Sequence, residues 1–371
     1  MRSKAYDGWL GGAATVAAGL ALSWMLSRRR RRMDLRGARV LITGGSRGLG
    51  FAAARRFLLE GAEVAICARD SAELERARSA LLEVAHARAS ELSTEAARVV
   101  AFRADVTDEA AVEWLVEETR SVLGGIDVLV NCAVEIAVGP LEALTVKDFE
   151  QAFRGIFLAT YCPTMAVLPH LRAQGHGRIV NVTSVAGKVP IPHNASYVVG
   201  KFAATGFSAV CATELRKYGI RVSNVMPPPL RNGAWMNAGY KGRVEEELAW
   251  FVTALSSPFV SIDPERAARA IVEAARYGDA EVMVSPSAWL QSRAYSLFPG
   301  VASAVLAAYE RLGMPSTPLG ARAAPVASGA EILATSEDER VQRVARRGKA
   351  AAERYLQPLA SKLDEQGRLA R

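Results

Sequence analysis

Strand-like and helix-like segments alternate along most of this 371-residue chain. Short apolar runs rich in Val and Ile are separated by longer stretches of helical composition, and such short runs, bounded by turn residues, are typical of strands buried in a parallel sheet. The alternation predicts an α/β fold: a doubly wound parallel sheet in three α/β/α layers, with helices on both faces. The expected strands are 39–43, 62–67, 99–104, 126–131, 178–182, 221–226 and 281–284.

A glycine-rich turn follows the first expected strand and precedes a helix expected over 49–60. Glycine lets the backbone turn sharply and approach a pyrophosphate closely. The N-terminus of the next helix offers free N–H groups and a positive dipole end. Because glycine motifs alone are weak signals, the strand–turn–helix context carries the prediction of a Rossmann-type dinucleotide-binding domain, with a plain tight turn as the alternative. The turn comprises Thr43, Gly44, Gly45, Ser46, Arg47, Gly48, Leu49 and Gly50.

The end of the second expected strand bears on which dinucleotide binds. Sites that prefer NAD usually have an acidic residue there, which accepts hydrogen bonds from the adenosine ribose. Here Ala68 and Arg69 follow the strand, and Arg47 of the glycine turn can reach the same place. Two cations and no acid favour NADP(H), whose 2′-phosphate they can pair with, although either arginine alone is typical of a surface charge. A helix is expected next, over 71–93, with Ser71 as its N-cap.

Three polar side chains form a candidate catalytic group. Tyr197 and Lys201 lie one turn apart on a helix expected over 196–215, so both project from one face. A neighbouring ammonium lowers a tyrosine pKa, which suits a group that protonates a carbonyl oxygen or deprotonates an alcohol. Ser184 follows the expected strand 178–182, and a doubly wound sheet presents its ligand groups at such strand ends. Each residue alone also fits a structural role, as a strand-end cap, a half-buried tyrosine or a surface lysine.

The order and approximate spacing of these motifs resemble the short-chain dehydrogenase/reductase family over residues 35–286. The resemblance implies an oxidoreductase that moves a hydride between NADP(H) and a carbonyl or alcohol. It implies that Tyr197 is the general acid/base and that Lys201 holds the nicotinamide ribose and tunes Tyr197. It also implies that Ser184 hydrogen-bonds the substrate oxygen.

The resemblance extends to cofactor contacts outside the glycine turn. Asp105, beside Val106, takes the place of the family's contact to the adenine amino group, and Asn131 stands at a strand end beside the cofactor. Asn232 takes the place of a threonine that meets the nicotinamide carboxamide. The implied cofactor-binding residues are Thr43, Gly44, Ser46, Arg47, Gly48, Leu49, Gly50, Arg69, Asp105, Val106, Asn131, Tyr197, Lys201 and Asn232.

Besides Asn232, four positions depart from the family's pattern. Cys132 and Val134 replace the second Asn and the Gly of its Asn-Asn-Ala-Gly motif, and Pro228 replaces a Gly after the sixth strand. Counting back without gaps puts Ile156 where many members have a fourth catalytic residue, an asparagine. A backbone carbonyl and water must then carry the proton relay. The departures leave an alternative function: a regulator or scaffold that binds the cofactor with little or no turnover.

The N-terminal region predicts attachment to a membrane. Residues 8–26 carry no charge, are about long enough to cross a bilayer as a helix, and have Trp9 and Trp24 near their ends. Arg28 to Arg32 follow directly, so the positive-inside rule places the catalytic domain in the cytoplasm. The alternative is a disordered or surface-lying arm on a cytoplasmic protein. The rest of the net charge of +8 is spread thinly, which predicts no nucleic-acid binding.

Three regions are expected along the chain: a hydrophobic anchor with its basic run (1–33), a catalytic domain (34–286) and a helical C-terminal extension (287–371). Within the domain, residues 230–262 take the place of the family's lid over the substrate. The lid's large apolar side chains either line an apolar pocket or pack into ordinary core. They are Trp235, Met236, Tyr240, Trp250, Phe251 and Phe259. No metal site is expected, because the cysteines and histidines lack ligand spacing.

The C-terminal extension is expected to be helical over 289–312, with a break at Phe298, and again over 331–359, with a linker near 314–328. The first stretch is apolar, and it either lies on a bilayer or packs on the domain or on a second subunit. Together with the lid and the anchor it favours a lipophilic carbonyl or alcohol as substrate. A homo-oligomer is what the family resemblance implies.

Overall fold

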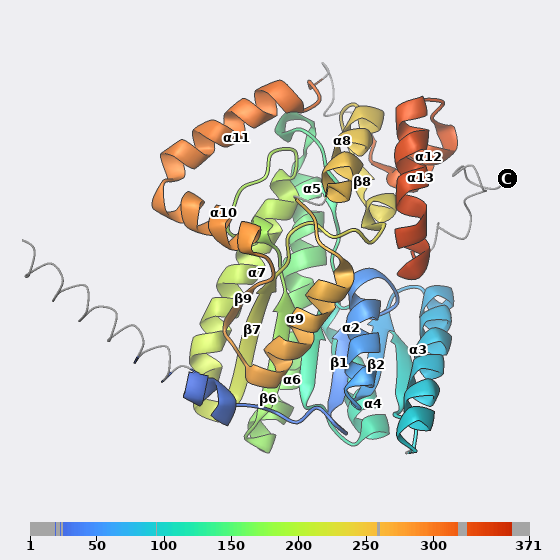
Figure 1. The fold of residues 1–371 in the computed structure, drawn as a ribbon, viewed down its shortest axis with the longest axis vertical. Coiled ribbons are helices and arrows are strands. Elements are labelled where there is room, and N and C mark those ends of the chain that lie inside the picture. Colours follow the sequence, from blue (N-terminus) through green and yellow to red (C-terminus); the bar gives the residue numbers. More distant parts are fainter. Residues whose placement is uncertain are drawn as a thin grey trace, which may run out of the picture.

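A computed structural model describes residues 25–93, 95–257, 260–317 and 325–357 of the chain, together with Gly19 and Ser23. A seven-stranded sheet lies at its centre in the order β3-β2-β1-β4-β6-β7-β9, and every neighbouring pair is parallel (Figure 1). The predicted doubly wound α/β fold is thereby confirmed. The strands are β1 (Arg39–Thr43), β2 (Glu63–Ala68), β3 (Val99–Arg103), β4 (Val128–Asn131), β6 (Gly177–Val182), β7 (Ile220–Met226) and β9 (Glu281–Met283).

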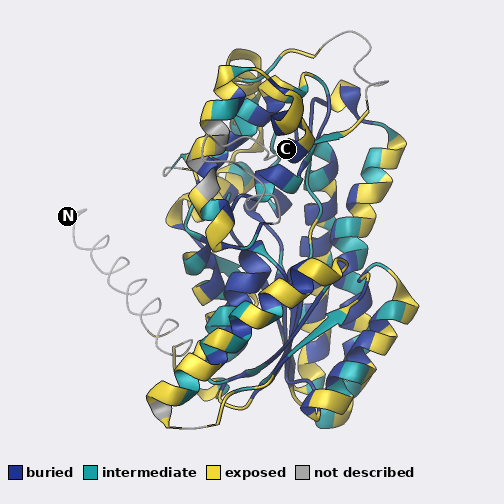
Figure 2. Cartoon of the chain, turned by 90° about the vertical axis from the view of Figure 1, so that its right-hand side faces the viewer, coloured by how far each residue is buried: buried dark blue, intermediate teal, exposed yellow. Residues whose placement is uncertain are grey.

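Helices cover both faces of the sheet. Side chains alternate along each strand and therefore pack into two separate cores, one on each face. Val40 and Ile42 of β1 pack on one face with α2, α3 and α9, while Leu41 packs on the other with α4, α6 and α7. Figure 2 shows the buried residues along the strands and the inner sides of the helices. The helices are α2 (Gly48–Leu59), α3 (Ser71–Leu92), α4 (Glu109–Leu123), α6 (Ala159–Gln174), α7 (Ala195–Glu214) and α9 (Pro264–Tyr277).

The strand order places the ligand crevice. Successive strands run outward from β1 in one direction and from β4 in the other, so the connections diverge between these two strands. In doubly wound sheets, ligands bind at such a switch point, beyond the carboxyl ends of the strands. Thr43 ends β1 and Asn131 ends β4 at this edge, paired in register.

The N-cap of α3 is not the predicted residue. Asp70, rather than Ser71, has the extended backbone of a cap, and its side chain accepts a hydrogen bond from the backbone N–H of Glu73 at 2.8 Å. Ser71 is the first residue of the helix itself. Asp and Ser both cap helices well, so residue type alone could not identify Asp70 rather than Ser71 as the N-cap.

The predicted lid and the C-terminal extension form one structure. A small sheet joins β10 (Ala327–Ser328), β8 (Gly239–Tyr240) and β5 (Ala137–Val138), in that order. Residues 327–328 therefore pair with the lid and do not belong to a linker. The single helix expected over 331–359 is also wrong, because α12 (Gly329–Thr335) ends before α13 (Glu339–Arg354) begins.

Half of the predicted pocket lining of the lid is core. Trp235, Met236 and Tyr240 are at most 2% exposed and pack with α8 (Val244–Ser256), α12 and α13. Trp250 is only partly buried, and its indole N–H donates to the hydroxyl of Tyr309 at 3.0 Å. Phe251 is also partly buried in this cluster. The sixth residue, Phe259, lies outside the described residues.

The predicted break at Phe298 is present. It separates α10 (Pro286–Leu297) from α11 (Pro299–Gly313), and no residue of α11 is buried. The two helices and Phe298 between them expose a set of large apolar side chains. These are Trp289, Leu290, Leu297, Phe298, Val301, Val305, Tyr309 and Leu312.

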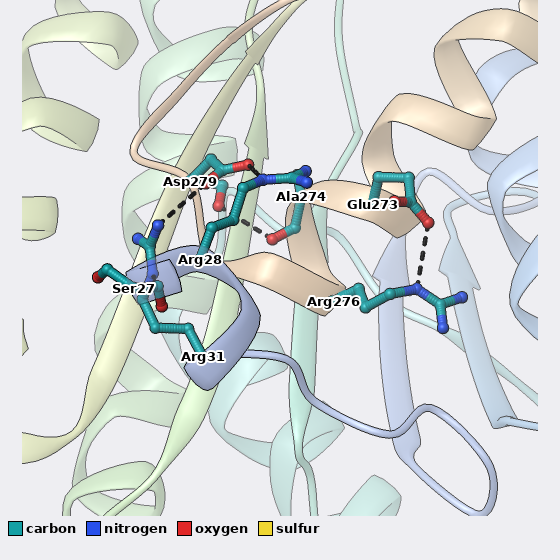
Figure 3. Close-up of polar contacts among 8 residues, drawn as sticks. Ser27, Arg28, Arg31, Glu273, Ala274, Arg276 and Asp279 are labelled. Atoms are coloured by element: carbon teal, nitrogen blue, oxygen red, sulfur yellow. Dashed lines mark hydrogen bonds and ion pairs between the residues drawn. The ribbon is translucent and has the colours of Figure 1, made fainter. Parts of the chain in front are cut away.

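The basic run is attached to the domain (Figure 3). Arg28 and Arg31 form ion pairs with Asp279 at 2.8 and 3.4 Å, and the guanidinium of Arg28 lies 3.8 Å from the ring centroid of Tyr277. Most of the predicted anchor, residues 8–26, lies outside the described residues. Within the part of the chain that the structure describes, no helix has the length and apolar character needed to span a bilayer.

Candidate active site

The three predicted catalytic residues meet at the carboxyl end of β6. Ser184 follows the strand and is 8% exposed, while Tyr197 and Lys201 lie one turn apart on α7. The ammonium of Lys201 is 5.6 Å from the ring centroid of Tyr197 and donates to the carbonyl of Val182 at 3.1 Å. The side chain of Ser184 also acts on Tyr197, because it lowers the pKa of that phenol. Tyr197 and Lys201 share one face of α7, as their spacing of four residues requires.

Ser184 also has a structural role. Its Oγ accepts a hydrogen bond from the backbone N–H of Ala186 at 3.1 Å, which caps a short 3₁₀ helix over Val185–Gly187. The same hydroxyl lies 3.5 Å from the carbonyl of Pro227, a weak contact. The cap holds the oxygen in place, so the hydroxyl proton can turn toward Tyr197 or a substrate oxygen.

The pKa of Tyr197 differs from the expectation. Burial raises the pKa of Tyr197 to about 12, and the hydrogen bond to Ser184 opposes this rise without cancelling it. Burial also lowers the pKa of Lys201 to about 8, because taking an ammonium out of water disfavours its charge. At neutral pH Tyr197 is therefore a neutral phenol, and the ammonium of Lys201 loses its proton more readily than a lysine in water. The predicted lowering of the Tyr197 pKa is absent.

These pKa values predict a pH dependence. As pH rises through about 8, Lys201 loses its charge while Tyr197, with a pKa of about 12, keeps its proton. We expect kcat/KM for NADPH to fall above pH 8, since this ratio follows the ionisation of the free enzyme. The profile is measured by NADPH oxidation across pH 6–10. Lys201→Arg, whose side chain stays charged, should have lower activity but no fall above pH 8. A flat profile for the unaltered chain would contradict this assignment.

The glycine turn is built for close backbone contact. Gly44 has φ +66°, and a Cβ there would lie 2.8 Å from Cα of Ala133 at the end of β4. A Cβ on Gly50 would overlap the carbonyl oxygen of Gly44. The hydroxyl of Thr43 accepts hydrogen bonds from the N–H groups of Cys132 and Ala133 at 3.0 and 3.2 Å. A cradle that only glycine can line fits the close approach of a dinucleotide pyrophosphate.

Asn131 faces the interior of the domain. Its side-chain NH₂ donates to Oγ1 of Thr164 at 3.0 Å and to Oδ1 of Asn181 at 2.9 Å. Its role in the described structure is to tie β4 to α6 and β6. Asp105 is exposed at the end of β3, next to the buried Val106, and its Oδ1 accepts from the N–H and hydroxyl of Thr107, each at 2.9 Å.

An acid that the sequence analysis missed, Glu73, lies beside the glycine turn. Arg47 donates to both carboxylate oxygens of Glu73 at 2.6 and 2.8 Å, and the hydroxyl of Ser46 donates to the same group at 3.3 Å. Arg69 is exposed at the end of β2. Of the two predicted cations, Arg47 is therefore held by an acid from the first turn of α3. Glu73, which lies three residues beyond the helix cap Asp70, was not considered in the sequence analysis.

Asn232 lies beside the glycine turn, and its predicted contact with a nicotinamide carboxamide stays a prediction. Its Nδ2 is 3.4 Å from the position of a Cβ on Gly48, and its Oδ1 accepts from the N–H of Ala234 at 3.1 Å. The C-terminal end of α13 reaches the same place. The backbone N–H of Gly48 donates to the carbonyl of Tyr355 at 2.7 Å, a contact that no sequence signal indicated.

Ile156 packs behind the catalytic helix. It lies in a π-helical turn, Phe153–Leu158, between α5 (Val146–Ala152) and α6, and is 1% exposed. A Cβ on Gly200, the residue before Lys201, would be 3.1 Å from the Cβ of Ile156. The carbonyl of Ile156 accepts from the hydroxyl of Thr160 at 2.9 Å. This π-helical turn therefore places the carbonyl of Ile156 near α7, where it already accepts one hydrogen bond from Thr160.

Sequence similarity to known proteins covers most of the domain that carries these residues. A family model described as short chain dehydrogenase matches residues 38–241. The dehydrogenase/reductase SDR family protein 7-like of Anopheles gambiae is 29% identical over 292 residues, 75% of this chain and 86% of that protein. The 3-dehydrosphinganine reductase of Danio rerio is 27% identical over 283 residues, 76% of this chain and 81% of that protein.

A solved structure has the same fold. The crystal structure of a metagenomic short-chain oxidoreductase in complex with NADP superposes with a TM-score of 0.53 at 25% sequence identity. The likeness covers 68% of this chain and 98% of that one.

Proposed function

The chain belongs to the short-chain dehydrogenase family, and we propose that it is an NADP(H)-dependent oxidoreductase acting on a lipophilic carbonyl or alcohol. The family assignment makes it an oxidoreductase of the carbonyl/alcohol type that uses a nicotinamide cofactor. The observation that carries the proposal is the convergence of Ser184, Tyr197 and Lys201 at one strand end.

The residues divide the chemistry between them. The bound nicotinamide supplies or accepts the hydride. Ser184 hydrogen-bonds the substrate oxygen and orients it toward Tyr197. Tyr197, a neutral phenol at physiological pH, gives its proton to that oxygen in reduction and takes one back in oxidation. Lys201, held by the carbonyl of Val182, places its ammonium next to the ring and binds the ribose.

The preference for NADP(H) is supported by Arg69 and by a related structure whose title names NADP. Arg69→Asp is expected to weaken NADPH binding about tenfold, since a charge-assisted bond to a phosphate contributes roughly 1.5–3 kcal/mol. The same change should relieve the bias against NADH. Fluorescence titration with both nucleotides measures the two dissociation constants. Arg120→Asp, in the last turn of α4, alters net charge equally and serves as the control. Unchanged affinities for both nucleotides would make Arg69 a surface charge only.

A lipophilic substrate is supported by a relative named for 3-dehydrosphinganine and by the exposed apolar faces of α10 and α11. The uncharged segment 8–26 and the five arginines that follow it, Arg28 to Arg32, support membrane attachment, with the domain on the cytoplasmic side. We propose the same three regions as units of function: anchor, catalytic domain with lid, and extension. Exposed apolar side chains along the π-helical turn Phe153–Leu158, α6 and α7 support self-association. They are Phe153, Met165, Val199, Phe202 and Val210.

The buried Ile156, whose carbonyl already has a donor, favours a second candidate: a scaffold that binds cofactor without turnover. NADPH oxidation with a panel of lipophilic ketones separates the two. Consumption of NADPH with any member supports the reductase. Tight NADPH binding without consumption across the panel supports the scaffold and overturns the proposed activity.

A further inference from the structure

The end of the C-terminal helix lies on the dinucleotide turn. The lower end of α13 in Figure 1 approaches the start of α2, and the first N–H of α2, that of Gly48, donates to the carbonyl of Tyr355 at 2.7 Å. The first N–H groups of a helix have no partner within it, and they are the groups that bind a pyrophosphate. In this chain one of them is taken by the chain's own backbone.

The side chain of Gln357 extends the contact along the crevice. It is 4% exposed, and its Nε2 lies 3.1 Å from where a Cβ on Gly48 would be. Its Oε1 accepts from the side chain of Asn237 at 2.8 Å. A Cβ on Gly233 would lie 3.2 Å from Cγ of Gln357. The amide therefore sits between the glycine turn and the Asn232–Gly233 segment, where the nicotinamide half of a dinucleotide passes.

The segment is held in a defined conformation. Tyr355 is 3% exposed in the core formed with α2 and α9, and its hydroxyl donates to Asp263 at 3.1 Å. Leu356 has φ +53°, in the left-handed region that disfavours side chains. The backbone N–H of Gln357 donates to the carbonyl of Ala352 at 2.9 Å. The chain thus turns back at Leu356 and brings Gln357 onto the turn.

We propose that residues 355–357, the strap, compete with the cofactor's pyrophosphate for the N-terminus of α2. The inference rests on the proposed function, since it needs a dinucleotide at this turn. A carbonyl oxygen and a phosphate oxygen cannot both accept the N–H of Gly48, so the cofactor binds the fraction of molecules in which the strap has moved. The apparent dissociation constant is larger than the intrinsic one by the inverse of that fraction.

Two shortened chains test the strap against a matched control. One ends at Arg354 and lacks the strap; the other ends at Gln357, keeps it, and lacks only residues 358–371. The chain that ends at Arg354 is expected to bind NADPH roughly fivefold more tightly than the full chain, as the loss of one or two net hydrogen bonds to the strap predicts. The chain that ends at Gln357 should match the full chain.

Point variants guard against loss of the fold on shortening. Gln357→Ala removes the amide from the crevice and should tighten NADPH binding about two- to threefold. Gln342→Ala, on α13 itself, is the control, because its amide donates to the carbonyl of Ser336 at 2.9 Å, away from the turn. In the full chain, NADPH should also speed hydrogen exchange at the N–H of Gln357, because the bond to Ala352 opens when the strap moves.

The outcomes separate the strap from the proposed function. Equal or weaker NADPH binding without the strap, or slower exchange at Gln357 with NADPH, overturns the strap and leaves the function standing. If neither the full chain nor either shortened chain binds NADPH or NADH, the proposed function fails and the strap fails with it.

Discussion

Tyr197→Phe is expected to abolish turnover, by a factor of about 10³ or more, while NADPH binds within about twofold of its original affinity. Removing the hydroxyl removes the proton donor, and general acid catalysis by one positioned group contributes about 10²–10⁴-fold. The ring remains, so the ammonium of Lys201 keeps its neighbour at 5.6 Å and its bond to Val182. Binding should change little for that reason.

The measurement pairs steady-state NADPH oxidation with a direct NADPH titration. Tyr161→Phe is the matched control: Tyr161 is also half-buried, on α6, where its ring stacks on Phe157 at 5.9 Å. That variant should keep its rate. If Tyr197→Phe retained the rate of the unaltered chain, Tyr197 would not be the general acid, and the enzyme assignment would lose its central residue.

Gly50→Ala should nearly eliminate cofactor binding and also destabilise the fold. The new Cβ would overlap the carbonyl oxygen of Gly44, and Gly44 is confined by the backbone of Ala133. Relief requires the glycine turn to open, which costs about 1–3 kcal/mol for an overpacked site. We expect the free energy of unfolding to fall by about 2 kcal/mol. NADPH affinity should fall by about a hundredfold, because the phosphate cradle is what moves.

Gly206→Ala is the control for adding one methyl group to a helix. Nothing lies within 4 Å of a Cβ at Gly206 on α7, so the change should raise the free energy of unfolding by about 0.5–1 kcal/mol. Urea denaturation and NADPH titration on both variants supply the comparison. Unaltered affinity in Gly50→Ala would show that the turn does not carry the phosphates.

The main sheet was predictable because most of its strands are mainly apolar runs buried on both faces. β1 begins and ends at the predicted residues, Arg39 and Thr43. The second sheet was not predictable, because β5, β8 and β10 have two residues each and a two-residue strand has no period to read. Pairing between strands so far apart in sequence is decided by tertiary contacts alone.

The relative placement of Ser184, Tyr197 and Lys201 was predictable for a related reason. Tyr197 and Lys201 are fixed to each other by one turn of helix, and Ser184 by the end of a strand. What failed were properties set by surroundings: the pKa of Tyr197, which burial raises, and the freedom of Arg47, which Glu73 restricts. The hydrogen bond from the N–H of Gly48 to the carbonyl of Tyr355 was equally unpredictable, because more than 300 residues separate the two partners.

One helix contacts both the lid and the glycine turn. Gly348 of α13 lies so close to the buried Trp235 that a Cβ there would be 2.8 Å from the indole ring, and the same helix ends on the glycine turn at Tyr355. A nucleotide that displaces the strap would therefore also shift the helix against which Trp235 of the lid packs. We expect the lid to settle around a second reactant only after the nucleotide has bound. Initial-rate patterns should accordingly show compulsory order of addition, with the nucleotide first on and last off.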